Sequence, residues 1–327
     1  MTIASSQKGS QVPQSARTVL PEIEWGLHAP LIEQIADLKR SRNAILLAHN
    51  YQTPEIFHGV GDLKGDSLAL AREAAKTEAE VIVLCGVHFM AETAKLLSPE
   101  KTVLIPDLEA GCSLAESITA ADVRELRQAH PGSPVVTYVN TSVEVKAESD
   151  VCCTSANALR IVDSLDADKI IFLPDEYLGR WVASQTHKEI VLWNGHCEVH
   201  ERFSGQEIRD YRTDLPDLVV LAHPECPPDV LDEADFVGST SAMSSWVRSH
   251  QPKCAILVTE CSMSDNVALE NPEVELIRPC NLCPHMKRIS LEKIRHSLET
   301  LTHRVEIDPT VATPARRAVE RMFEFSA

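Results

Sequence analysis

The chain contains short runs of β-branched and other apolar residues, and each run ends in polar residues. Three of these runs, at residues 44–52, 134–142 and 218–226, read AILLAHNYQ, PVVTYVNTS and LVVLAHPEC. A continuous apolar run of this length that stops at a polar cluster is typical of a buried strand in a parallel sheet. We therefore predict three buried strands whose carboxyl ends carry polar side chains.

A turn rich in small and hydroxyl-bearing residues follows each of these strands. The turns begin at Lys64, Cys153 and Gly238, and they read KGDSLALA, CTSANALR and GSTSAMSS. Asp, Ser, Thr and Gly are the residues that favour the amino terminus of a helix, because they satisfy its free N–H groups or fit its entry geometry. The pattern predicts that a helix begins in each turn.

The same order of elements then continues three times. Second strands are predicted within residues 80–89, 169–178 and 254–263, and third strands within residues 101–114, 188–200 and 273–286. Each third segment contains cysteine, with 85 residues from Cys112 to Cys197 and 86 from Cys197 to Cys283. Likewise, 89 residues separate His49 from Tyr138, and 85 separate Tyr138 from His223. These agreeing intervals predict three copies of one structural unit.

Alternating strands and helices predict an α/β protein with parallel sheets, in which ligands bind at the carboxyl ends of the strands. We expect three homologous α/β/α units related by pseudo-threefold symmetry around a central active site. The predicted boundaries are a disordered leader at 1–23, units at 24–122, 123–206 and 207–300, and a C-terminal segment at 301–327. The stretch TPARRAVERMFEF in that last segment predicts a closing amphipathic helix.

Charge and composition exclude several classes of protein. The chain of 327 residues has 31 basic and 48 acidic residues and a net charge of -17, which argues against nucleic acid or an anionic membrane as a partner. It contains neither an apolar run long enough to span a membrane nor an apolar signal-peptide core. We therefore expect a soluble, cytoplasmic protein. In that reducing compartment, the ten cysteines should not form a disulfide framework.

The repeat register brings three cysteines towards one centre. It favours Cys283 over Cys280 as the partner of Cys112 and Cys197, and a site with three thiolates leaves one position open for substrate. The alternative is that Cys280 adds a fourth ligand and the site holds structural zinc. The role of Cys261 is left undecided. The remaining cysteines adjoin apolar strands and are expected in the core: Cys85, Cys152, Cys153, Cys226 and Cys254.

Polar residues two positions apart end the first strand of every unit, and this spacing places both side chains on one face. The pairs are His49 with Tyr51, Tyr138 with Asn140, and His223 with Glu225. A neighbouring carboxylate and imidazole suit general acid and base catalysis. The hydroxyl turns add three residues that either cap helices or bind anionic groups at the helix amino termini, namely Ser67, Ser155 and Thr240.

Three other polar residues receive weaker predictions. Lys146 is a candidate phosphate contact, but an isolated lysine is more often exposed to solvent, and we expect it there. His200 lies three residues after Cys197, so it either forms a hydrogen bond near the cysteine site or lines the cavity. We place His196 behind the site or on the surface.

Ten motifs together resemble the quinolinate synthase family: AHNYQ, GDSLALA, FMAETAKLLSP, AGCSL, YVNTS, TSANA, NGHCEVH, AHPEC, VGSTS and CPHMK. The resemblance runs from about residue 31 to residue 325. It implies that iminoaspartate and dihydroxyacetone phosphate are condensed to quinolinate, with release of phosphate and water, by an enzyme with a 4Fe-4S cluster. The family's cluster ligands match Cys112, Cys197 and Cys283. Its substrate contacts match His49, Ser67, Tyr138, Asn140, Ser155, His223, Glu225 and Thr240.

On this basis we hypothesise that Glu225 shuttles protons, that His223 and Tyr51 assist it, and that the open iron acts as a Lewis acid. The expected partners are the two small-molecule substrates, with a transient contact to the L-aspartate-oxidising enzyme. Some family members have a longer C-x-x-C-x-x-C cluster, which is shortened here to Cys280 and Cys283, so a redox role for Cys280 stays open. Two alternatives also remain: a non-catalytic structural zinc or iron-sulfur protein, and an iron-sulfur hydratase acting on another hydroxy acid.

Overall fold

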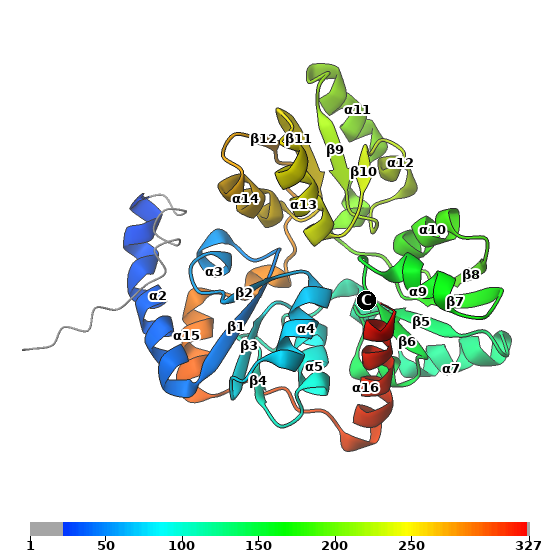
Figure 1. The fold of residues 1–327 in the computed structure, drawn as a ribbon, viewed down its shortest axis with the longest axis horizontal. Coiled ribbons are helices and arrows are strands. Elements are labelled where there is room, and N and C mark those ends of the chain that lie inside the picture. The colour runs from blue at the N-terminus through cyan, green and yellow to red at the C-terminus, as the bar shows by residue number, and fades with distance from the viewer. Residues whose placement is uncertain (1–21, 326–327) are drawn as a thin grey trace, which may run out of the picture.

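A computed structural model describes residues 22–325 of the chain. The predicted leader lies outside the described residues up to residue 21, and the first helix begins at Glu22. The fold class is confirmed: the protein is α/β, with three parallel four-stranded sheets that are consistent with three α/β/α units. Figure 1 shows the three units arranged around a common centre.

All three sheets share one topology. The first sheet contains β1 (Ala44–His49), β2 (Leu63–Gly65), β3 (Val81–Cys85) and β4 (Thr102–Leu104). The second contains β5 (Val135–Tyr138), β6 (Val151–Cys153), β7 (Lys169–Leu173) and β8 (Glu189–Leu192). The third contains β9 (Val219–Ala222), β10 (Phe236–Val237), β11 (Cys254–Val258) and β12 (Glu275–Ile277). Each sheet runs in the order second, first, third and fourth strand, and all pairs are parallel, so the carboxyl ends of its strands lie at one edge.

Each sheet therefore has one strand more than the sequence pattern predicts. The additional strands β2, β6 and β10 have only two or three residues and pair at one edge of their sheets. A strand this short has no detectable hydrophobic period, and its pairing with the first strand is settled only in three dimensions.

Helices surround the sheets. Those of the first unit are α2 (Glu22–Arg42), α3 (Pro54–Phe57), α4 (Ser67–Lys76), α5 (His88–Leu97) and α6 (Ser113–Glu116). Those of the second are α7 (Ala120–Ala129), α8 (Val143–Ala147), α9 (Ala158–Ser164), α10 (Glu176–Gln185) and the short η1 (His200–Arg202). Those of the third are α11 (Gly205–Asp214), α12 (Pro228–Leu231), α13 (Thr240–His250), α14 (Cys261–Glu270) and η2 (Met286–Arg288). The chain ends with α15 (Leu291–Thr300), which packs on α2, and α16 (Pro309–Glu324). Within the described residues, no helix is both long and apolar enough to cross a membrane.

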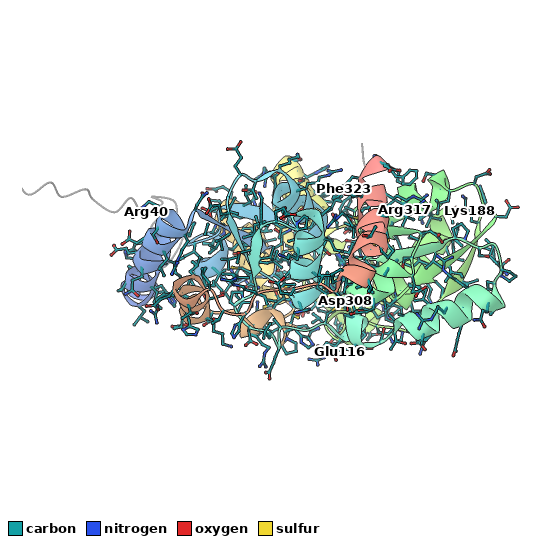
Figure 2. All side chains as sticks on the ribbon, turned by 90° about the horizontal axis from the view of Figure 1, so that it is seen from below. Arg40, Glu116, Lys188, Asp308, Arg317 and Phe323 are labelled. Atoms are coloured by element: carbon teal, nitrogen blue, oxygen red, sulfur yellow. A yellow bond between two sulfur atoms is a disulfide. The ribbon has the colours of Figure 1, made fainter. Side chains whose placement is uncertain are left out.

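Helix α16 lies in the stretch where the sequence predicts a closing amphipathic helix. Its buried residues, among them Ala315, Val319 and Met322, face α8, β6 and α5, so it joins the first unit to the second. Figure 2 shows the molecule as a slab in which α16 runs across the thickness, from Asp308 near one face to Phe323 near the other. The helix thus closes the seam between two units.

The apolar core is divided unequally among the units. One large cluster of buried side chains runs through the first and second units and also includes Met286 and Leu291. A smaller cluster lies in the second unit, and two others lie in the third unit. Four of the five cysteines that we expected in the core are buried there, but Cys254 is wrong, because it begins the strand β11 and is partly exposed.

The prediction for Lys146 is wrong. Its side chain is 0% exposed; the ammonium lies 5.6 Å from the ring centroid of Phe89 and donates a hydrogen bond to the carbonyl oxygen of Thr141. Burial lowers the pKa of Lys146, while the nearby Glu92 carboxylate opposes that shift. Lys146 of the second unit and Glu92 of the first are thus both buried and close enough to influence each other's pKa.

We predict that Lys146→Met destabilises the protein, because the buried Thr141 carbonyl loses its donor and Glu92 loses a nearby positive charge that lowers its pKa. The free energy of unfolding should fall by about 2 kcal/mol, the scale for leaving a buried polar group without its hydrogen-bond partner. Urea unfolding followed by circular dichroism measures this change. Lys169→Met removes a lysine that pairs with Glu189 at the surface, so it serves as the control, with a loss below about 1 kcal/mol. Equal losses in both variants would contradict the role assigned to Lys146.

Candidate active site

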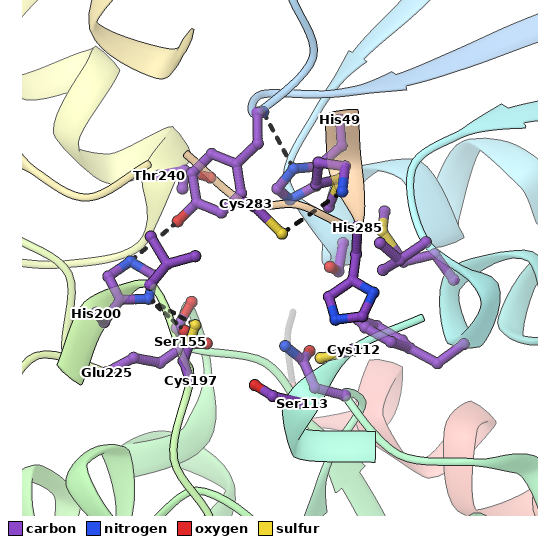
Figure 3. Close-up of a pocket in the computed structure, with 18 of the residues that line it drawn as sticks. His49, Cys112, Ser113, Ser155, Cys197, His200, Glu225, Thr240, Cys283 and His285 are labelled. Atoms are coloured by element: carbon purple, nitrogen blue, oxygen red, sulfur yellow. Dashed lines mark hydrogen bonds and ion pairs between the residues drawn. The ribbon is translucent and has the colours of Figure 1, made fainter. Parts of the chain in front are cut away.

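The predicted site residues come together in one cavity where the three units meet. Figure 3 shows side chains from all three units pointing into it. Every residue that the sequence analysis assigned to catalysis, substrate binding or the cysteine site lines this cavity: His49, Tyr51, Ser67, Cys112, Tyr138, Asn140, Ser155, Cys197, His223, Glu225, Thr240 and Cys283.

The two histidines at strand ends are held by the same local hydrogen bond. The Nδ1 atom of His49 accepts from the backbone N–H of Tyr51 at 3.2 Å, and Nδ1 of His223 accepts from the backbone N–H of Glu225 at 3.4 Å. An Nδ1 atom that accepts leaves the proton on Nε2 in the neutral ring. Burial lowers the pKa of His49 to about 4 and that of His223 to about 3, so both rings are neutral at pH 7.

Glu225 is the central carboxylate of the cavity. It is 3% exposed, accepts a hydrogen bond from the Tyr138 hydroxyl at 2.5 Å, and lies 2.8 Å from Nδ1 of His200. Burial alone would raise the pKa of Glu225, but the neighbouring His223 and His200, together with these hydrogen bonds, lower it well below its ordinary value. Glu225 is therefore an ionised carboxylate at pH 7 that is held by the donors around it.

His200 occupies both of the positions that the sequence left open. Its Nδ1 atom lies 3.1 Å from the sulfur of Cys197, and its buried ring lines the cavity and stacks on His223 with centroids 4.8 Å apart. The feature of the sequence that pointed to His200 was its position three residues after Cys197. His196 lies behind the cavity, where it pairs with Glu176 at 2.9 Å.

The hydroxyl residues do not serve as helix caps. Asp66 caps α4 and Ser239 caps α13, each by accepting a backbone N–H, so Ser67 and Thr240 are the first helical residues. Thr240 accepts a hydrogen bond from the Asn50 side chain at 2.8 Å. In the second unit, Ser155 lies 3.2 Å from Nε2 of His223, and Oδ1 of Asn140 is buried without a hydrogen-bond partner among the described residues. The cavity thus contains polar groups that no helix end requires.

Three cysteines enter the cavity from loops that follow the fourth strands. Burial raises the pKa of Cys112 to about 12, that of Cys283 to about 11 and that of Cys197 well above its ordinary value, so without a bound metal the groups are thiols. Among the described residues, one set of donors lies within 4.8 Å of one another, and it comprises Cys197, His200 and Glu225 rather than the three cysteines. The three cysteine sulfurs are therefore not all within 4.8 Å of one another.

Cys280 does not join the other cysteines. It forms a disulfide with Cys261, so the structure does not fit the alternative in which Cys280 is a fourth zinc ligand. It also shows one disulfide where we expected none, although the rest of the cysteines are free in the described chain. The two sulfurs come together because α14 and the loop before Cys283 lie side by side, with the Cys261 backbone N–H donating to the Asn281 carbonyl.

An ion pair between Glu260 and Lys287 holds the Cys283 loop in place. The Glu260 carboxylate is fully buried, accepts the backbone N–H of Cys283 at 3.3 Å, and lies 2.9 Å from the Lys287 ammonium. Lys287 also donates to the backbone carbonyl of Tyr51 at 2.7 Å and to Ser262 at 2.6 Å. Lys287 therefore connects the loop that carries Cys283 to the strand end that carries Tyr51.

Comparison with known proteins gives one consistent result. The family model described as "Quinolinate synthetase A protein" matches residues 33–324. Quinolinate synthase 2 of Mesorhizobium japonicum is 66% identical over 304 residues, which cover 93% of this chain and 94% of that protein. Quinolinate synthase of Agrobacterium fabrum is 62% identical over 306 residues, covering 94% and 89%, and that of Xylella fastidiosa (strain Temecula1) is 65% identical over 291 residues, covering 89% and 86%.

We predict that Lys287→Met loosens the Cys283 loop, because Glu260 loses the cation that holds it in place. In metal-free protein, iodoacetamide should alkylate Cys283 about tenfold faster, which corresponds to about 1.4 kcal/mol of local stability. Peptide mass spectrometry measures the rate at each cysteine, with Cys112 as the internal reference. Lys293→Met, which removes a surface pair with Asp107, should leave the Cys283 rate unchanged. An unaltered alkylation rate of Cys283 in Lys287→Met would refute the role of Lys287 in holding this loop in place.

Proposed function

The chain belongs to the quinolinate synthase family, and on that premise we propose that this enzyme of NAD biosynthesis condenses iminoaspartate with dihydroxyacetone phosphate. The products are quinolinate, one phosphate and two waters, which together account for every atom of the two substrates. The observation that carries the proposal is the convergence of three cysteines and three polar strand ends, one set from each unit, in a single cavity.

The cysteine set fits a 4Fe-4S cluster held by Cys112, Cys197 and Cys283. A zinc–sulfur bond is about 2.3 Å long, so ligands of one zinc ion lie within about 4.6 Å of each other. The absence of a three-cysteine set within 4.8 Å among the described residues therefore argues against a single zinc ion held by these three cysteines. When bound by three thiolates, such a cluster supplies an iron with an open coordination position that acts as a Lewis acid towards substrate oxygens.

Neutral donors would hold the substrate carboxylates and the phosphate. Neither Lys nor Arg occurs among the described residues that line the cavity. Ser67 and Thr240 stand at the amino termini of α4 and α13, where free backbone N–H groups and the helix dipole favour anions. The Nε2–H groups of His49 and His223 and the amide of Asn140 add hydrogen-bond donors to the same space.

Glu225 is the proposed general base. Its carboxylate accepts a proton from carbon or nitrogen of the bound substrates and returns it to a departing hydroxyl group, which leaves as water. The Tyr138 hydroxyl and His200 Nδ1–H hold the carboxylate in place through these steps. His223 and Tyr51 assist it, His223 as a donor through Nε2 and Tyr51 through its phenol.

Supply of substrate fits the same proposal. Iminoaspartate hydrolyses readily because it is an imine, so a transient contact with the L-aspartate-oxidising enzyme would shorten its exposure to water. We place both enzymes in the cytoplasm. The net charge of -17 argues against nucleic acid as a further partner.

Metal analysis tests the cofactor directly. Protein purified without oxygen should contain about four iron and about four acid-labile sulfide per chain. Cys283→Ala should lose them because a cluster ligand is gone, whereas Cys280→Ala should keep them because Cys280 pairs with Cys261 outside the ligand set. Zinc without sulfide, or equal loss in both variants, would exclude the three-cysteine cluster.

The role of Glu225 is tested by Glu225→Gln. Gln keeps the size and one acceptor oxygen but cannot take up a proton at neutral pH, so kcat for quinolinate formation should fall about 10³-fold while the iron content stays unchanged. Quinolinate and released phosphate are measured together, since phosphate release separates a synthase from a hydratase. Glu233→Gln, which alters a surface pair with Arg209 in the same unit, should behave as wild type. Retained turnover in Glu225→Gln would remove Glu225 from the mechanism.

A further inference from the structure

A groove runs between α16 and the second unit and shares no lining residue with the central cavity. We call it the α16 groove; its volume is about 440 Å³, and it is lined by Arg127, Ala147, Glu148, Ser149, Asp150, Thr313, Pro314, Arg317 and Arg321. Figure 2 shows Arg317 where α16 lies beside the second unit. A neighbouring cavity of about 380 Å³ shares Arg127, Asp150 and Arg321 with the groove and lengthens it.

Two arginines of α16 point their charge at this groove. Arg317 and Arg321 are four positions apart, so they are neighbours on one face of the helix. Arg321 donates a hydrogen bond to the backbone carbonyl of Asp150 at 2.7 Å. Arg317 is exposed, and no ion pair of either arginine occurs in the part of the chain that the structure describes.

The carboxylates at the groove already have other partners. Asp150 lies 2.8 Å from Arg127, and Glu148 lies 2.7 Å from Arg124. Asp166 lines only the neighbouring cavity, which Arg317 does not line. Like charges one helical turn apart destabilise a helix, so an anion bound between the two arginines of α16 would remove a repulsion that no carboxylate of the groove removes.

We propose that the α16 groove is a binding site for an organic diphosphate. The planar guanidinium group donates two parallel hydrogen bonds to phosphate oxygens, and two such groups one helical turn apart can each hold one phosphate of a linked pair. The organic part of the ligand lies along the neighbouring cavity, and the volume of the groove is that of a small-molecule site.

This inference goes beyond the proposed function and does not rest on it. Helix α16 packs on α8 and β6 of the second unit and on α5 of the first. A ligand held between α16 and the loop at Glu148 and Asp150 therefore adds contacts at the junction of these two units. Binding to the folded protein alone stabilises it by mass action.

Calorimetry with a series of nucleosides tests the site on the full-length protein. At physiological salt, ADP should bind with a Kd below about 1 mM, AMP at least about tenfold more weakly, and adenosine without measurable heat. These three probes share one base and one sugar, so the series reports the phosphates alone. No binding of ADP, or equal affinities for ADP and adenosine, would overturn the proposal.

Substitution of Arg317 tests the residue that carries the argument. Arg317→Gln should weaken ADP binding at least about tenfold, and Arg317→Lys, which keeps the charge but not the fork, should give an intermediate affinity. The variant should unfold at the same urea concentration as wild type, because Arg317 is exposed. Arg295→Gln removes the same charge from a surface pair with Glu299 and should bind ADP as wild type does. Equal ADP affinities in wild type and Arg317→Gln would refute the site.

Hydrogen exchange locates the bound ADP independently of affinity. ADP should slow exchange in α16 and at residues 147–150 of wild type, and Arg317→Gln should lose this protection. Slowed exchange at residues 223–225 of the central cavity, with none in α16, would place ADP in the central cavity instead and contradict the proposal.

Discussion

An ionised carboxylate buried at the meeting point of three units is the constraint on which the rest of the site depends. Glu225 cannot be ionised in that position unless donors surround it, because an unpaired buried charge is expensive. The second unit provides two of these donors, Tyr138 and His200. Each donor must itself be held, and the chain from His200 through Thr259 to Tyr51 carries this requirement into the third and first units. The ionised Glu225 carboxylate is therefore connected to side chains of all three units through hydrogen bonds.

The sequence predicted the site better than it predicted the interactions that hold it. Parallel sheets place strand ends at one edge, so a threefold repeat of polar strand ends was enough to identify the residues that line the cavity. Lys146 could not be placed from sequence, because its burial depends on the Phe89 ring and the Thr141 carbonyl, which come close only in the folded chain. The same holds for the pairing of Cys261 with Cys280, which lie 19 residues apart on different elements.

The edge strands and Thr259 were missed for different reasons. Strands β6 and β10 are too short for a periodic pattern, and only the pairing with their neighbours defines them. Thr259, by contrast, is a polar residue directly after an apolar run of the sequence, as His49 is. The repeat drew attention to positions that recur, whereas Gly86 and Pro174 stand at the positions in the other two units that correspond to Thr259. Symmetry identifies what the units share, and the asymmetric chemistry of one reaction must come from the positions at which they differ.

The contacts between the units also differ from one pair of units to another. The first and second units share one apolar cluster, and α16 covers their junction. The third unit meets the first through polar contacts: Asn266 donates to the carbonyls of Asn50 and Gln52, Lys287 to that of Tyr51, and Asn50 to the Thr240 hydroxyl. Separating an apolar seam exposes surface to water at a cost of about 25 cal/mol per Å², whereas water can replace the partners of a polar seam at little net cost. The hydrogen bonds between the third unit and the first therefore lie at the same seam that carries Cys283, Thr259 and Glu225 to the other half of the site.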